Sequence, residues 1–334
     1  MELFILGTSS GVPTKARNVS ATAVCITNRK PWYLVDCGEG TQHRLLHLPL
    51  SLANLRAIFI THVHGDHTYG LPGLLATAAM VGRTEPLTII CPPEIETFIK
   101  QTQLLSDMFV NYPMEFIHTH SKGVLFSDDA IEVKAVPLSH RVPTHAFVFT
   151  KTIKKVQLDR QKLMDDGISQ GPLWGKIQQG IDVQLSDGRT IVANDYRQVN
   201  QDRKRIIVSG DNDTPEKLAD VAEGAHVLMH ESTYTQEISD KVGKSPMHSS
   251  AKAVASFAER HNIPNLVLTH FSARYHSIEA LNYSKIKSTK GHNIQEVEDE
   301  AKQYYSGNLI LANDLEHYIL DDQGQLNKND NLPL

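Results

Sequence analysis

The chain has 334 residues, of which 40 % are hydrophobic and 21 % charged, proportions that are ordinary for a soluble globular protein with a sizeable core. Apolar runs are too short for a membrane span and no basic stretch leads into an apolar segment, so we expect neither a membrane helix nor a secretory leader. The 33 Lys and Arg against 38 Asp and Glu give a net charge of −5, which alone does not indicate a nucleic-acid-binding protein. Three scattered cysteines exclude a disulfide framework and favour a cytoplasmic location.

Short apolar runs bounded by turn residues dominate the first half of the chain and predict β-strands. These runs lie at residues 2–7, 22–26, 32–36, 55–61, 86–91 and 131–138. Helices are expected at 73–81 and 94–109, where apolar residues recur at spacings of three and four.

The same alternation continues in the second half. Strands are expected at 205–210, 225–230 and 265–270, and helices at 215–224 and 249–261. The whole pattern predicts an α/β fold with mixed sheets.

Residues 151–204 interrupt this alternation, because they are polar, rich in turn residues and poor in β-branched runs. They carry more basic than acidic side chains, whereas the rest of the chain is net negative. We expect a flexible arm, inserted into a single domain spanning residues 1–320, that projects from the core and meets a polyanion; a solvated surface loop is an equal alternative. Residues 321–334 lack apolar periodicity and are expected to fray.

Potential metal ligands are concentrated directly after the strand expected at 55–61. His62, His64, Asp66 and His67 bring three imidazoles and a carboxylate within six residues, an arrangement that is costly without a cation. In an extended loop His62 and His64 point to one side and can bind one ion, while Asp66 and His67 face a second. Gly65 is expected to allow a sharp turn between the two pairs. The spacing therefore predicts a two-metal site.

Further candidate ligands follow other predicted strands. His140 comes after the strand ending at Leu138, Asp211 follows the run 205–210, and His270 ends the run 265–270. Functional groups of α/β proteins gather at the carboxyl ends of strands, so these three residues are expected to complete the site.

The HxHxDH run of His62, His64, Asp66 and His67 resembles the signature of the metallo-β-lactamase superfamily. Within that superfamily the chain resembles the ribonuclease Z family of the short bacterial type, from Met1 to about residue 318. The similar blocks lie at residues 6–19, 34–46, 64–75, 167–180, 230–233, 247–250 and 269–275.

This resemblance implies a four-layer αβ/βα sandwich with a protruding tRNA-binding arm, two zinc ions per subunit and a homodimer. It also implies an endonuclease that removes the 3′ trailer from precursor tRNA, leaving a 3′-hydroxyl on the tRNA and a 5′-phosphate on the trailer. The ligands do not distinguish zinc from Mn²⁺ or another divalent ion.

The resemblance also implies how the ligands divide between the ions. One ion would be held by His62, His64, His140 and Asp211, and the other by Asp66, His67, Asp211 and His270. The family usually has Gly-Asp-Thr at the bridging aspartate, but here Gly210 is followed by Asp211, Asn212, Asp213 and Thr214. Asp213 is therefore a rival bridge, although Asp211 is preferred because it directly follows the strand and Gly210.

Three residues are expected to act in catalysis. Asp66 would accept a proton from the attacking water, and His248 would donate one to the leaving oxygen. Glu231 would orient His248. The alternative for His248 is a cap or surface histidine before the helix that begins near Ser249.

Contacts with RNA are expected from several basic or glycine-rich positions. Arg274 would bind phosphate, and Lys15 and Arg17 lie in a loop similar to the one that reads the 3′ end; surface charge is the alternative for both. The block resembling the tip of the tRNA-gripping arm contains Gly171, Pro172 and Lys176.

Two other functions fit parts of the pattern. A phosphodiesterase or arylsulfatase acting on small esters would share the metal ligands but would not need the segment 151–204. A non-catalytic RNA-binding or metal-storage module would need neither a bridging aspartate nor an acid at His248.

Overall fold

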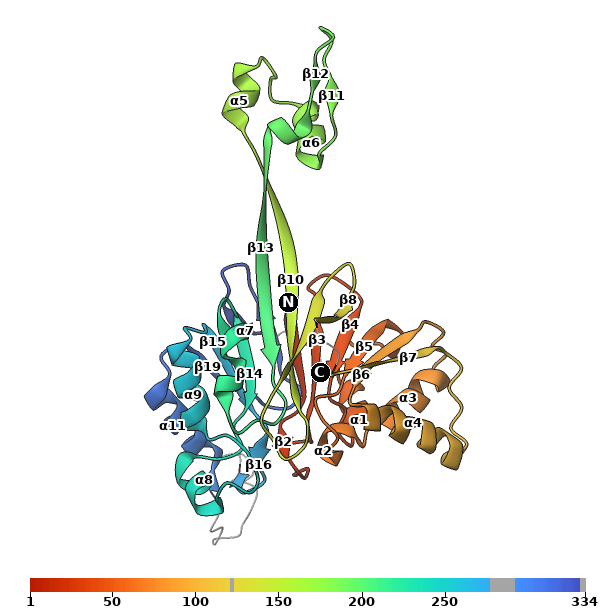
Figure 1. Cartoon of the computed structure of the whole chain (residues 1–334), viewed down its shortest axis with the longest axis vertical. Coiled ribbons are helices and arrows are strands. Elements are labelled where there is room, and N and C mark those ends of the chain that lie inside the picture. The colour runs from red at the N-terminus through yellow and green to blue at the C-terminus, as the bar shows by residue number, and fades with distance from the viewer. Residues whose placement is uncertain (121–122, 277–291, 331–334) are drawn as a thin grey trace. The chain divides into compact units, whose positions relative to one another are not determined.

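The computed structural model describes residues 1–120, 123–276 and 292–330. The chain divides into two compact units, one formed by residues 1–150 with 205–334 and the other by residues 151–204. Figure 1 shows the chain and labels many of its helices and strands.

The first unit contains two large mixed sheets. The order in the eight-stranded sheet is β21-β20-β1-β3-β4-β5-β6-β7. Its strands are β1 (Glu2–Gly7), β3 (Ala21–Cys25), β4 (Trp32–Val35), β5 (Leu55–Phe59), β6 (Leu87–Cys91), β7 (Met114–His118), β20 (His317–Leu320) and β21 (Leu326–Lys328). Strands β4 to β7 run parallel, and the remaining pairs of this sheet are antiparallel.

The seven-stranded sheet has the order β19-β15-β14-β13-β10-β9-β8. Its strands are β8 (Val124–Ser127), β9 (Glu132–Pro137), β10 (His145–Leu158), β13 (Arg197–Val208), β14 (Val227–Glu231), β15 (Asn265–Thr269) and β19 (Asn308–Leu311). The parallel run β13-β14-β15-β19 brings the carboxyl ends of these strands to one edge.

Successive side chains of a strand point to opposite faces of the sheet. In both large sheets, apolar side chains on each face are buried. In β1, Leu3 and Ile5 pack in the core shared by the two sheets, together with Phe147 of β10. Phe4 and Leu6 pack instead in an outer core with α1 (Thr41–Leu45), α3 (Leu71–Met80) and α4 (Pro93–Ser106).

The second sheet is covered in the same way. Val148 and Ile207 face away from the central core toward α9 (Ala251–Arg260) and α11 (Ile294–Tyr304). Figure 1 shows α3 and α4 outside one sheet and α9 and α11 outside the other. The order helix, sheet, sheet, helix confirms the predicted αβ/βα sandwich.

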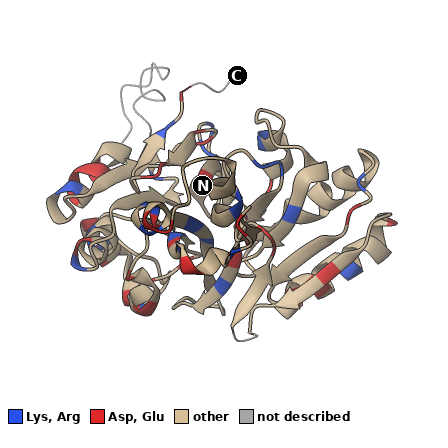
Figure 2. Cartoon of the chain, turned by 90° about the horizontal axis from the view of Figure 1, so that it is seen from above, with Lys and Arg blue, Asp and Glu red and all other residues tan. Residues whose placement is uncertain are grey.

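Shorter elements complete the first unit. They are α2 (Gly65–Thr68), α7 (Ala219–Ala222), α8 (Gln236–Val242), β2 (Ser9–Ser10), β16 (Phe271–Ser272), β17 (Tyr275–His276) and β18 (His292–Asn293). The outer helices carry both signs of charge, as Figure 2 shows, with Lys100 paired to Glu96 on α4 and Lys302 to Glu298 on α11. Within the described ranges, none of the helices combines the length and apolarity needed to cross a membrane.

The second unit, residues 151–204, has a small apolar core of its own. It contains α5 (Arg160–Asp165), α6 (Pro172–Gln179), β11 (Val183–Gln184) and β12 (Thr190–Ile191). Leu163, Trp174 and Ile177 are buried together, and the Trp174 indole donates to the Ile168 carbonyl at 3.0 Å. The segment expected as a flexible arm therefore includes a packed core, built from apolar residues that are scattered through a polar stretch of sequence.

The end of the chain departs from the expectation of fraying. Residues after Leu320 turn back, and β21 pairs with β20 in antiparallel register. Leu326 is buried in the central core. The expectation that residues 321–334 fray is thus wrong for residues 321–330, because β21 is paired and Leu326 is buried. Residues 331–334 lie outside the described part of the chain.

Candidate metal centre

Seven candidate side chains converge at the strand ends of the first unit. His62 and His64 lie between β5 and α2, and His140 follows β9. Asp211 comes after β13 and His270 directly after β15. Gly65 opens α2 without a left-handed φ, so the sharp turn expected there is replaced by the start of a short helix.

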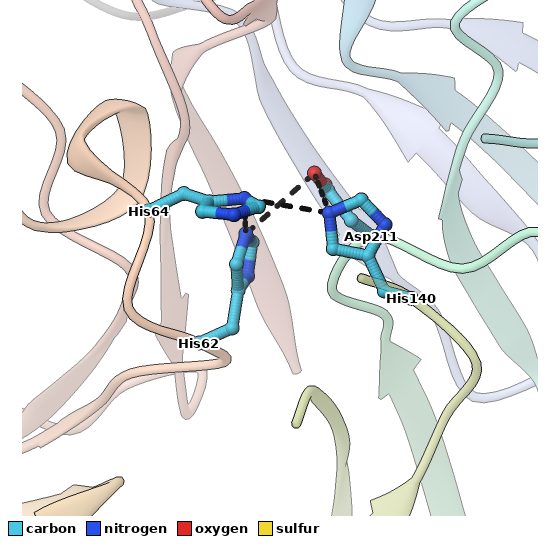
Figure 3. A group of neighbouring side chains, drawn as sticks. All are labelled: His62, His64, His140 and Asp211. Atoms are coloured by element: carbon cyan, nitrogen blue, oxygen red, sulfur yellow. Dashed lines mark hydrogen bonds and ion pairs between the residues drawn. The ribbon is translucent and has the colours of Figure 1, made fainter. Parts of the chain in front are cut away.

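One ligand group consists of His62, His64, His140 and Asp211, whose ligand atoms all lie within 4.8 Å of one another. Figure 3 shows these four side chains pointing toward a common centre. Nε2 of His62 lies 3.0 Å from Nδ1 of His64, and Nε2 of His140 lies 3.3 Å from that same Nδ1. Ring nitrogens that face one another at this range suit a shared cation.

A second group is formed by Asp66, His67 and His270. Nε2 of His67 lies 3.3 Å from Nε2 of His270, and Oδ2 of Asp66 lies 3.4 Å from the same His270 nitrogen. The four residues of the HxHxDH run therefore separate into the two pairs that their spacing predicts.

Asp211 faces both groups with different oxygens. Its Oδ2 lies 3.6 Å from Nε2 of His62 and 3.6 Å from Nε2 of His140. Its Oδ1 lies 3.4 Å from Nε2 of His67 and 3.4 Å from Nε2 of His270. Asp213 belongs to neither group, and its carboxylate accepts a hydrogen bond from the Thr214 hydroxyl instead. Of the two aspartates, Asp211 is thus the one that faces both ligand groups.

The outward nitrogens of these imidazoles are held by other residues. Nδ1 of His67 donates to Asp36 at 2.7 Å, and Nδ1 of His62 donates to the Thr61 hydroxyl, which in turn donates to Asp36. Nδ1 of His140 donates to the Met247 carbonyl at 2.9 Å. Such hydrogen bonds fix the tautomer that leaves the inward Nε2 free to bind a metal.

Asp36 is the site residue that the sequence analysis did not assign. It follows β4, where Val35 is the last strand residue, and it is 5 % exposed. Its position after a buried strand was the available signal, the same one that singled out Asp211.

The protonation of the side chains also fits divalent cations. Burial lowers the pKa of His62, His64 and His140, which keeps these imidazoles neutral at pH 7 with a lone pair available. Burial also opposes charge on His67, but nearby carboxylates, above all that of Asp211, raise its pKa. The carboxylates of Asp211, Asp66 and Asp36 surround His67, and a bound cation would neutralise part of their negative charge. The ligand groups can therefore hold divalent metal.

His248 and Glu231 form a buried pair beside these ligands. Nδ1 of His248 donates to Oε1 of Glu231 at 2.9 Å and lies 3.9 Å from Oδ2 of Asp211. Burial works against charge on His248, but the charge and hydrogen bond of Glu231 raise its pKa to about 9. His248 precedes α9, whose N-cap is Ser250, so the cap alternative applies to Ser250 rather than to His248.

Asn212 connects these parts of the site. Its backbone N–H donates to Glu231, and its carbonyl accepts from the hydroxyl of Ser249, the residue after His248. Its side-chain oxygen accepts from the backbone of Ser139, the residue before His140. The extra residues after Asp211 thus fill a buried position that links three strand ends.

The ligand groups open into a pocket of about 440 Å³. Its lining includes His64, Asp66, Asp211 and His248, so both ligand groups and the Glu231–His248 pair can be reached from one opening. A phosphate ester entering this pocket would meet the carboxylates, imidazoles and a charged histidine together.

The residues expected to contact RNA lie in different environments. Lys15 and Arg274 are exposed in the first unit, whereas Gly171, Pro172 and Lys176 are exposed in the second. Arg17 is only 5 % exposed, and its guanidinium donates to Thr8, to the Ala312 carbonyl and to Asn313. The expectation that Arg17 contacts RNA is therefore corrected: its guanidinium is buried and makes these three hydrogen bonds within the fold.

Comparison with known proteins identifies a family model and relatives that are similar to this chain. The family model of the anti-Pycsar protein Apyc1 matches residues 1–140. Ribonuclease Z of Marinobacter nauticus is 50 % identical over 330 residues, which cover 99 % of each chain. Ribonuclease Z of Pseudomonas putida is 52 % identical over 326 residues, covering 98 % of this chain and 99 % of that protein.

A solved structure shares the fold. Human tRNase Z, short form, aligns with 96 % of this chain and 100 % of its own at a TM-score of 0.63 and 24 % identity. With relatives at half identity along the whole length, the chain belongs to the ribonuclease Z family.

Proposed function

We propose that this chain is a zinc-dependent endoribonuclease that removes the 3′ trailer from precursor tRNA. The observation that carries the proposal is the position of Asp211, which faces both ligand groups and lies beside the Glu231–His248 pair. Relatives named ribonuclease Z, aligned along nearly the whole chain, support the choice of substrate.

Two ions per subunit are proposed. His62, His64, His140 and Asp211 would hold one, and Asp66, His67, Asp211 and His270 the other. When bound, such ions neutralise charge on the phosphoryl oxygens and make water nucleophilic at neutral pH. Zinc suits the imidazole-rich ligands, and Mn²⁺ competes for the same atoms.

In the proposed reaction a water oxygen bonds to phosphorus and the bond from phosphorus to O3′ of the tRNA breaks. The phosphate stays on the trailer and the tRNA keeps a 3′-hydroxyl. Burial opposes charge on Asp66, but His67 and His270 outweigh this effect and lower the pKa of Asp66, so the carboxylate is ionised and can accept the proton that the water loses.

The departing O3′ needs a proton, which His248 is proposed to donate. With its pKa raised to about 9, His248 is protonated at neutral pH. Glu231 holds the ring through Nδ1, so Nε2 remains the nitrogen that can deliver a proton. Glu231 is itself fixed by the Asn212 backbone and the Thr233 hydroxyl.

The rest of the tRNA would be bound through its phosphates. Residues 151–204 contain ten Lys or Arg and seven Asp or Glu, and Lys176 on α6 is exposed beside Gly171 and Pro172. We propose that this unit contacts the tRNA body, while Lys15 and Arg274 contact the 3′ end. A homodimer in the cytoplasm is proposed on the same family resemblance.

The test is incubation of the purified, metal-analysed protein with a 3′-extended precursor tRNA. A single cut near the end of the acceptor stem, lost in Asp66→Ala, is expected. Replacement of residues 160–195 by a short turn should abolish tRNA cleavage and spare hydrolysis of a bis-aryl phosphodiester. Hydrolysis of the small ester alone by the unaltered protein would reject the tRNA substrate and favour a small-ester phosphodiesterase.

A further inference from the structure

We propose that Tyr69 and Arg141 form a nucleotide subsite at the opening of the metal centre. In this subsite Tyr69 stacks on a base and Arg141 pairs with a phosphate next to the scissile one. The inference rests on the proposed function and specifies how the single-stranded 3′ end is held while it is cut.

Both residues line the same pocket as the metal ligands. The pocket of about 440 Å³ is bordered by Tyr69 and Arg141 together with His64, Asp66 and His248. A volume of this order lies within the range of small-molecule sites, about 300 to 1,000 Å³, which is the scale expected for a single nucleotide.

Tyr69 presents an exposed aromatic ring at this opening. Its side chain is 67 % exposed although it immediately follows α2, which carries Asp66 and His67. The ring lies directly against Gly65, where an added Cβ would come within 2.2 Å of a ring carbon. Gly65 therefore leaves room for the ring to pack against the start of α2, while most of the side chain stays exposed.

Arg141 is the one Lys or Arg among the described residues that line this pocket. It directly follows His140, and it makes no hydrogen bond or ion pair with any residue in the described ranges. Apart from its histidines, the other ionisable side chains that line the pocket are the carboxylates of Glu39, Asp66 and Asp211. A phosphate held outside the metal-ligand groups would therefore be drawn to Arg141.

An exposed ring and an unpaired guanidinium at one opening match single-stranded nucleic acid. Every base has a π-face that can stack on tyrosine regardless of sequence, and each stacked base contributes about 1–3 kcal/mol to binding. Arginine supplies a planar fork for phosphate oxygens. Paired acceptor-stem bases cannot use such a platform, so the subsite favours the unpaired end.

The experiment measures KM and kcat on a 3′-extended precursor tRNA, with metal content checked for each variant. Tyr69→Ala should raise KM about 5- to 150-fold. Tyr69→Phe keeps the ring and should have the same KM as the unaltered protein. Arg141→Gln should raise KM and reduce the slope of log KM against log salt by about 0.7, the value for one contact with single-stranded phosphate. Arg141→Lys should keep the slope. Arg56→Gln, an exposed arginine on β5 outside the pocket, is the matched control.

A second arm locates the stacked base. Abasic nucleotides are placed in turn at the positions flanking the cut, and one position should weaken binding to the unaltered protein but not to Tyr69→Ala. A merely structural role for Tyr69 would give the same loss at every position. The subsite would be overturned if the unaltered protein cleaves the tRNA and if Tyr69→Ala and Arg141→Gln leave KM and the salt slope unchanged. That result would leave the proposed function intact. Failure of the unaltered protein to cleave would overturn both.

Discussion

Glu231 accepts a hydrogen bond from Nδ1 of His248 at 2.9 Å, and the two side chains are 2 % and 10 % exposed. Because protonated His248 is the form that donates, activity should fall as the pH rises through its pKa of about 9. Glu231→Gln removes the charge that contributes most to raising this pKa and leaves burial opposed by the smaller effect of Asp211, so the fall should begin at a lower pH, by about one unit.

Single-turnover cleavage rates between pH 6 and pH 10 check this shift. The loss caused by Glu231→Gln should be larger at pH 8.5 than at pH 6. A variant whose rate is reduced equally at every pH would contradict the role of Glu231 in holding the proton on His248.

The two aspartates after β13 should differ sharply in metal binding. Asp211→Asn removes a carboxylate that faces both ligand groups, so both ions should be held more weakly. Asp213→Asn changes a carboxylate that accepts a hydrogen bond from the Thr214 hydroxyl and lies in neither ligand group, so metal content should be unchanged. Elemental analysis after dialysis against a weak chelator distinguishes the two, and metal loss in Asp213→Asn alone would reverse the assignment.

Asp36 should control metal affinity without binding the metal. It accepts from Nδ1 of His67 and, through Thr61, supports His62. Replacing a carboxylate of this kind typically weakens metal binding about 10- to 100-fold, and Asp36→Asn should do the same. Competition with a chromophoric chelator gives the affinity, and circular dichroism confirms that the variant is folded. An unchanged affinity would mean that the His67 tautomer is set by other contacts.

Two basic residues of one loop should differ in their effect on stability. Arg17→Ala leaves Thr8, Asn313 and the Ala312 carbonyl without their buried donor, and should lower the free energy of unfolding by about 2–4 kcal/mol. Lys15→Ala, at an exposed position two residues away, should change it by less than about 0.5 kcal/mol. Urea unfolding of the metal-loaded proteins measures both, and equal stabilities would show that Arg17 is not needed inside the fold.

Local patterns predict those parts of the structure that local interactions determine. The strand expected at residues 2–7 matches β1, because its alternating side chains fill two cores at once. The HxHxDH run likewise identifies both ligand groups, since four of their residues are neighbours in sequence.

Contacts between distant residues explain what the sequence did not reveal. Arg17 was expected at the surface, yet two of its partners, Ala312 and Asn313, are nearly 300 residues away. The outer halves of β10 and β13 were not expected as strands, because their side chains are largely exposed and carry no apolar periodicity. In each case the determining partner lies on another part of the chain.

The candidate metal ligands come from loops of both sheets, with His62 and His67 after β5 in one and Asp211 and His270 after β13 and β15 in the other. Neither half of the sandwich alone contains a complete set of ligands. The site should therefore be complete only once both sheets are folded and packed together. A fragment that contains only one of the sheets would lack part of each catalytic requirement and should be inert toward RNA.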